Sequence, residues 1–103
     1  MNNIFNLSFP LPNEEYFETL LQQNNLRIER IISTGQVTPL EQWYDQPQDE
    51  WVILLQGKAI LRYEQGEEFT LQTGDYLLLK AHQKHRVEFT SVNPPCVWLA
   101  IHY

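Results

Sequence analysis

The sequence predicts one mostly β domain whose short strands close a barrel or a sandwich around a small pocket. A length of 103 residues favours a single domain. Apolar residues make up 43% of the chain and aromatic residues 13%, which is typical of a globular protein. From Leu26 onward, apolar and polar residues alternate with a period of two, and turn residues interrupt the pattern about every 8 to 12 residues. This spacing favours antiparallel strands over parallel β-α-β units.

The first 25 residues form a separate segment in this interpretation. We expect residues 1–12, rich in Asn and Pro, to be an extended arm. Phe17, Leu20 and Leu21 recur at helical spacing, and Glu14 and Glu15 would favour the first turn of a helix. We therefore predict one short helix over residues 14–23. The chain then divides into an arm and helix (residues 1–25) and a barrel (residues 26–103).

The rest of the chain is expected to form strands. Gly57 ends an apolar run, Gln65-Gly66-Glu67 is typical of a hairpin turn, and Arg62 and Arg86 should lie on solvated strand faces. We predict strands over residues 26–32, 40–44, 51–55, 58–64, 68–72, 76–79, 85–91 and 97–103.

The run Trp51–Leu55 is apolar on both faces. If Val52 and Leu54 face the barrel interior, then Trp51, Ile53 and Leu55 face outward. Three large apolar side chains in water would form a costly patch that something must cover. We therefore expect a homodimer, or a cover provided by the N-terminal segment.

Charge and cysteine content narrow the function classes. The net charge is −6, and an acidic surface disfavours nucleic acid and anionic membranes as partners. The single cysteine, Cys96, excludes a disulfide within the chain and is expected to be a small buried residue. The N-terminus has no basic and apolar leader, and no run reaches the roughly 20 apolar residues of a membrane helix. We expect a cytoplasmic location.

Two motifs resemble the cupin superfamily, specifically a small single-domain type-2 cupin. Glu50 is followed after six residues by Gly57, and Gly74-Asp75 is followed by an apolar strand, a turn and His85. The resemblance covers about residues 35–103. It implies an RmlC-like jelly roll, also described as a double-stranded β-helix.

The resemblance also raises the question of a metal site. The family's site uses His-x-His before the Glu, but the residues before Glu50 contain no His, and Lys80 and His82 replace the usual Pro and Gly of the turn. Only Glu50 and His85 match, and two ligands are too few for a tight site. His102 would complete a set suited to Zn, Fe, Mn or Ni if it faces inward with Trp98 and Ala100. If Leu99, Ile101 and Tyr103 face inward instead, His102 lies outside.

These observations favour two classes of function, and the sequence does not decide whether the protein is an enzyme. We favour a cupin that binds a small molecule in the barrel with weak or no metal. The alternative is a metal-dependent isomerase, epimerase or dioxygenase that uses Glu50, His85 and His102. Without metal, Glu50 and His85 are candidates for an acid–base couple. An interaction domain that works through its dimer surface is a third reading. Aromatic residues expected in the pocket are Tyr44, Tyr63, Phe89 and Trp98.

Overall fold

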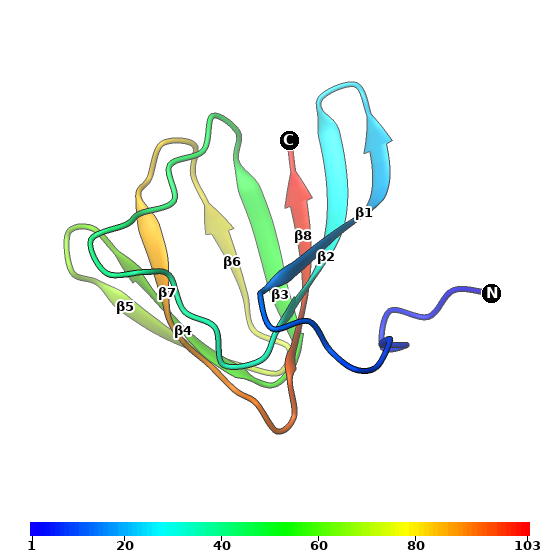
Figure 1. The fold of residues 1–103 in the computed structure, drawn as a ribbon. Helices are drawn as coiled ribbons and strands as arrows, with labels where there is room; N and C mark the ends of the chain where they lie inside the picture. The colour runs from blue at the N-terminus through cyan, green and yellow to red at the C-terminus, as the bar shows by residue number, and fades with distance from the viewer.

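The computed structural model describes residues 1–103 and contains eight antiparallel strands in two sheets (Figure 1). It has no helix long and apolar enough to cross a membrane. The strands are β1 (Tyr16–Gln23), β2 (Leu26–Ser33), β3 (Glu50–Gln56), β4 (Lys58–Tyr63), β5 (Glu68–Gln72), β6 (Tyr76–Leu79), β7 (His85–Thr90) and β8 (Cys96–His102).

The two sheets form the jelly roll that the sequence predicts. One sheet has the strand order β1-β2-β8-β3-β6 and the other β5-β4-β7. In Figure 1 they converge where β3 passes into β4 and diverge at the opposite end. The core lies between them, and its largest fully buried side chains include Leu54, Leu71 and Val97. Along most strands, successive side chains alternate between the buried and the outer face of the sheet. The alternation of apolar and polar residues in the sequence therefore predicted the strands.

The predicted helix over residues 14–23 is wrong, because this segment forms strand β1. Gln23 pairs with Leu26 across a two-residue turn, and Asn24 has a φ of 53°, a conformation that Asn tolerates. The chain therefore makes a hairpin where the predicted helix would end. β1 pairs with β2 along its whole length, and this tertiary pairing outweighs a weak helical pattern.

The predicted strand over residues 40–44 is also absent. The chain is a loop there, and Glu41 has a φ of 66°. Arg86, expected on a solvated face, is instead only 3% exposed and donates hydrogen bonds to the carbonyls of Thr38 (2.8 Å) and Pro39 (3.2 Å). Arg86 therefore anchors this loop to β7.

The outer face of the five-stranded sheet is apolar, as the run Trp51–Leu55 predicted. The strand register aligns one row across all five strands, consisting of Leu21, Ile28, Ile101, Trp51 and Leu78. A second row contains Glu18, Arg30, Leu99, Ile53 and Tyr76. Several of these side chains remain exposed, and Tyr76 is 63% exposed. The N-terminal arm is held beside this face, because Arg30 donates hydrogen bonds to backbone carbonyls of the arm.

Gly57 is the corner at which the chain leaves one sheet and enters the other. Its φ is +98°, a conformation that residues with a Cβ adopt only with strain. A Cβ at this position would also lie 2.7 Å from the Oγ of Ser91 and 3.0 Å from the Sγ of Cys96. Cys96 is fully buried, as expected. No larger residue fits at this corner without displacing its neighbours.

We expect Gly57→Ala to lower the free energy of unfolding by about 3 kcal/mol, from backbone strain and overpacking together. Gly66→Ala is the matched control, because Gly66 has a φ of +108° but open space around its Cβ position. The control should lose only about 1 kcal/mol. Urea denaturation of the two variants measures the difference, and equal losses would contradict the steric account of the corner.

Candidate functional site

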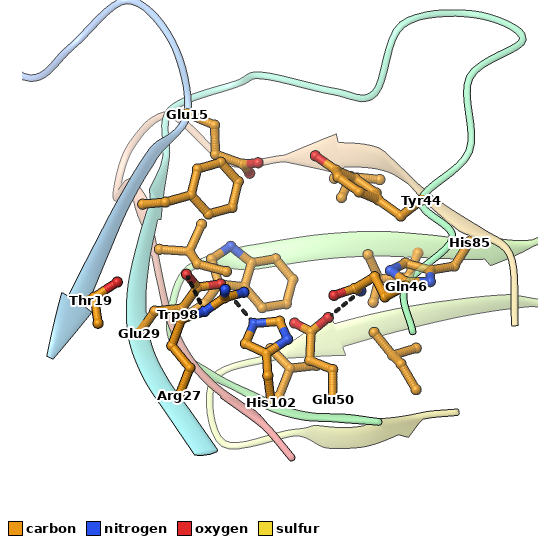
Figure 2. A pocket seen from close by; sticks show the side chains of 16 residues that line it. Glu15, Thr19, Arg27, Glu29, Tyr44, Gln46, Glu50, His85, Trp98 and His102 are labelled. Atoms are coloured by element: carbon orange, nitrogen blue, oxygen red, sulfur yellow. Dashed lines mark hydrogen bonds and ion pairs between the residues drawn. The ribbon is translucent and has the colours of Figure 1, made fainter. Parts of the chain in front are cut away.

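A pocket of about 360 Å³ lies between the two sheets and is shown in Figure 2. The first residues of β3 and β7 and the last residue of β8 line it. Half of its sixteen lining residues are apolar. These form a hydrophobic interior that includes Ile31, Val52, Leu61, Leu79, Val87 and Trp98.

Glu50 is a buried carboxylate that points into this pocket (Figure 2). It is the first residue of β3 and only 7% exposed. The Nε2 of Gln46 donates a hydrogen bond to its Oε1 at 2.7 Å. Its Oε2 receives no hydrogen bond from the protein side chains or backbone. Because a buried charge is costly without partners, this oxygen favours a ligand that carries a hydrogen-bond donor.

His102 faces the pocket, so the alternative in which Leu99, Ile101 and Tyr103 face inward is wrong. Its Nε2 donates a hydrogen bond to the Oε1 of Glu29 at 2.8 Å, and both residues are buried. Arg27 lies on the same carboxylate, with 3.6 Å between its Nε and the Oε2 of Glu29. His102 also pairs with Glu50 in the register of β3 and β8. One wall of the pocket is therefore a row of paired polar side chains.

The rings of Tyr44 and His85 stack with their centroids 5.5 Å apart. The two residues also exchange backbone hydrogen bonds, which fix the loop residue Tyr44 against the start of β7. The Nδ1 of His85 donates to the carbonyl of Gln83 at 3.1 Å. In the neutral ring this leaves Nε2 as the acceptor, so His85 offers the pocket an acceptor and an aromatic face.

Glu15 belongs to a hydrogen-bond chain at the other side of the pocket. The indole Nε1 of Trp98 donates to the Oγ of Ser33 at 3.2 Å, and that hydroxyl donates to the Oε2 of Glu15 at 2.5 Å. Burial raises the pKa of Glu15, and the nearby negative charge of Glu50 raises it further, whereas the Ser33 hydrogen bond opposes the shift. Burial and the charge of Glu15 likewise raise the pKa of Tyr44.

The structure brings together most of the predicted site residues. Glu50, His85, His102, Tyr44 and Trp98 all line the pocket. His82, by contrast, is an exposed turn residue whose Nδ1 lies 2.9 Å from an oxygen of Asp45.

The predictions for Tyr63 and Phe89 are corrected. Tyr63 does not line the pocket; it is buried in the core with its ring 5.0 Å from that of Phe69. Phe89 is 42% exposed and lies outside the pocket. A β-bulge explains this, because Ile60 pairs with Phe89 while the next residue, Leu61, pairs with Val87. The extra residue reverses the alternation that had placed Phe89 inside.

Five polar residues of the pocket were not predicted from the sequence: Glu15, Thr19, Arg27, Glu29 and Gln46. Thr19 lies on β1, where a helix was expected. Arg27 and Glu29 alternate with apolar residues along β2, and a charged inner face is the reverse of the usual pattern. Glu15 and Gln46 lie in loops, where alternation gives no signal. Only the tertiary structure places these five side chains together.

A family model described as "Cupin domain" matches residues 31–102. The chain belongs to the cupin family. No curated protein matches this cupin. Among solved structures, a "putative mannose-6-phosphate isomerase" from Ralstonia eutropha is 42% identical, covers 99% of this chain and 95% of its own, and has a TM-score of 0.89.

Two more distant structures share the cupin fold. A cupin superfamily protein from Desulfitobacterium hafniense is 20% identical, with a TM-score of 0.73, and the match covers 87% of this chain and 77% of that one. An RmlC-like cupin protein from Desulfovibrio desulfuricans is 17% identical, with a TM-score of 0.68, and the match covers 99% and 96% of the two chains. At these identities the likeness shows the fold alone.

The residues of this cupin do not fit the metal ion that the family often holds. No three His, Cys, Asp or Glu side chains lie close enough to hold one. Glu50, His85 and His102 share the pocket, but the Nε2 of His102 is directed at Glu29 and the Oε1 of Glu50 at Gln46. The pocket therefore offers hydrogen-bonding groups rather than a set of metal ligands.

We expect the contribution of Glu15 to the stability of this cupin to fall as the pH rises above 4.5, the ordinary pKa of a Glu side chain. Because the folded pKa of Glu15 is raised, the folded state holds its proton when the unfolded state has lost it. The stabilisation from the protonated carboxyl of Glu15 is fully present below pH 4.5. It is lost as the pH rises through the raised pKa of Glu15 in the folded state.

The variant Glu15→Gln should remove this part of the pH dependence, measured by urea denaturation from pH 4 to 7.5. The exposed neighbour Glu14 provides the control variant Glu14→Gln. A pH profile that is the same in Glu15→Gln and in the unmodified protein would show that Glu15 does not titrate as described.

Proposed function

We propose that this cupin binds a small organic molecule between its two sheets, through hydrogen bonds and apolar contacts and without a metal ion. The observation that carries the proposal is the Oε2 of Glu50, which has no hydrogen-bond partner in the protein although the residue is only 7% exposed and lines the pocket. A ligand donor would supply the missing hydrogen bond. The pocket volume of about 360 Å³ lies within the range of small-molecule sites.

The pairing of the other polar groups supports the same function. Glu29 is held by His102 and Arg27, and Gln46 is held by Glu50. Because these side chains already have protein partners, a ligand meets groups of fixed orientation and pays little to order them. The apolar interior would then bury the body of the ligand and favour its transfer from water.

A second candidate is an isomerase, and the similarity to the Ralstonia protein favours it. In that case Glu50 and His85 are the candidates for moving a proton between neighbouring carbon atoms of a substrate. A coupled assay for isomerisation of mannose 6-phosphate tests this. Turnover that disappears in both Glu50→Gln and His85→Ala would support it, and no turnover would count against this substrate.

Ligand binding should disappear when the pocket mouth is blocked. Thr19 is exposed on the edge strand β1 and lines the pocket, so Thr19→Trp should obstruct the mouth without disturbing the core. Tyr16→Trp is the matched control, because Tyr16 lies on the opposite face of β1. We expect ligands that raise the melting temperature of the unmodified protein and of Tyr16→Trp to leave Thr19→Trp unchanged. Equal shifts in all three proteins would place binding outside this pocket.

We also propose that a second copy of the chain covers the outer face of the five-stranded sheet. Of the ten residues in its two rows, only Glu18 and Arg30 are charged, and they pair at 2.7 Å. These two rows therefore carry no net charge, so two copies of the chain would meet there without like charges facing one another.

The cytoplasmic location expected from the sequence stays a prediction.

Light scattering at micromolar concentration should return twice the 12.3 kDa mass of one chain. Leu78→Lys places a charge in the first row and should shift the protein to the mass of a monomer. Leu40→Lys is the control, because Leu40 is 85% exposed on the loop. A monomeric mass for the unmodified protein would refute the dimer.

A further inference from the structure

The pocket carries more carboxylates than cations. Glu15, Glu29 and Glu50 all line it, whereas Arg27 is its single Arg or Lys side chain. Its charge is partly offset by Glu29, because the Nε of Arg27 lies 3.6 Å from the Oε2 of that residue. The three carboxylates come from different parts of the chain, and Figure 2 shows them on the walls of one cavity.

The other cations of the chain do not reach the pocket. Arg30 lies on the outer face, where it pairs with Glu18 and holds the N-terminal arm. The remaining cations are absent from the pocket lining, and three of them have acidic partners elsewhere: Arg62 and Arg86 with Glu88, and Lys84 with Glu64. A phosphate or carboxylate in the pocket would therefore meet three carboxyl side chains and a single cation, Arg27, which lies beside one of them.

Glu50 lies where a ligand cation would be held. It is 7% exposed, its Oε1 is bonded by Gln46, and its Oε2 has no donor in the protein. A protonated amine offers up to three donors and a positive charge, so it would satisfy this oxygen better than a neutral hydroxyl. The stacked rings of Tyr44 and His85 and the indole of Trp98 provide aromatic surface near it, which also attracts organic cations.

We propose that the ligand of this pocket carries a protonated amine, which binds at the open oxygen of Glu50, and an apolar or ring-shaped body that packs against Trp98 and Tyr44. This inference rests on the proposed binding function and specifies its ligand class. It also implies that a phosphorylated sugar is a poor ligand, in contrast to the substrate for which the Ralstonia protein is named.

Two sets of matched probes test the charge preference by isothermal titration calorimetry at pH 6.5. The first set is mannosamine, mannose and mannose 6-phosphate, which share one ring and differ in charge. The second set is 2-phenylethylamine, 2-phenylethanol and phenylacetate. In at least one set we expect the amine to bind at least tenfold more tightly than its neutral and anionic counterparts.

The variant Glu50→Gln removes the charge while retaining the shape, and it should abolish this tenfold preference. Glu68→Gln is the control, because Glu68 is exposed on β5 and outside the pocket. Should Glu50→Gln fail to fold, Glu15→Gln tests the second carboxylate and should also weaken amine binding.

The calorimetry distinguishes failure of the charge inference from failure of the proposed binding function. Neutral or anionic probes that bind as tightly as the amines would overturn the charge inference and leave the binding function intact. Amine binding that survives unchanged in Glu50→Gln would assign it to the acidic surface and overturn the inference as well. The absence of binding by all six probes at millimolar concentration would overturn the proposed function itself.

Discussion

The hydrogen bond between His102 and Glu29 governs the chemistry of this pocket. Both side chains are more than nine-tenths buried, and an unpaired carboxylate at such a depth would cost several kcal/mol. The pair satisfies Glu29 and directs the Nε2 of His102 across the sheet, at 2.8 Å from Oε1. The side chains of Glu50, His85 and His102 do not come close enough together to hold a metal ion. Glu50, its neighbour in the register, keeps one oxygen open to the pocket.

The rest of the site surrounds this pair with two further constraints. Arg86 fixes the loop that carries Tyr44, so that the tyrosine ring stacks on His85. Trp98 and Ser33 hold Glu15 at the other side through successive hydrogen bonds. The polar groups are thus oriented by protein partners above an apolar interior. Such preorganisation favours recognition of one ligand shape and one pattern of charge.

Strand alternation predicted the short antiparallel strands of a barrel or sandwich well, because one face of nearly every strand is buried and burial enforces a period of two. The jelly-roll arrangement of these strands was implied by the cupin resemblance. The same rule placed Glu50 and His85 inside and placed Trp51 outside. Alternation failed at the bulge between Val87 and Phe89, where one extra residue reverses the two faces. It failed again before residue 26, because pairing between β1 and β2 is a tertiary effect that a helical spacing of apolar residues does not reveal.

The candidate site was predictable only where a motif or an alternating strand supplied the residue. Glu50 and His85 came from the cupin resemblance, and His102 came from its phase with Trp98 on β8. Glu29 was missed because a charged residue is stable on an inner face only when it has a partner. Its partner, His102, is distant in the sequence. Glu15 was missed because its side chain reaches the pocket from the segment before β1. Pairings of this kind are set by the fold rather than by local pattern.

Metal titration of the purified, untagged protein tests the central claim that polar pairs, rather than a metal ion, organise this pocket. Zn, Mn, Fe and Ni would each be added to the protein under calorimetry, after elemental analysis of the protein as purified. The account predicts less than stoichiometric metal and no saturable binding, with ligand affinity unchanged by a chelator. One tightly bound ion per chain that is lost in both His85→Ala and His102→Ala would contradict it.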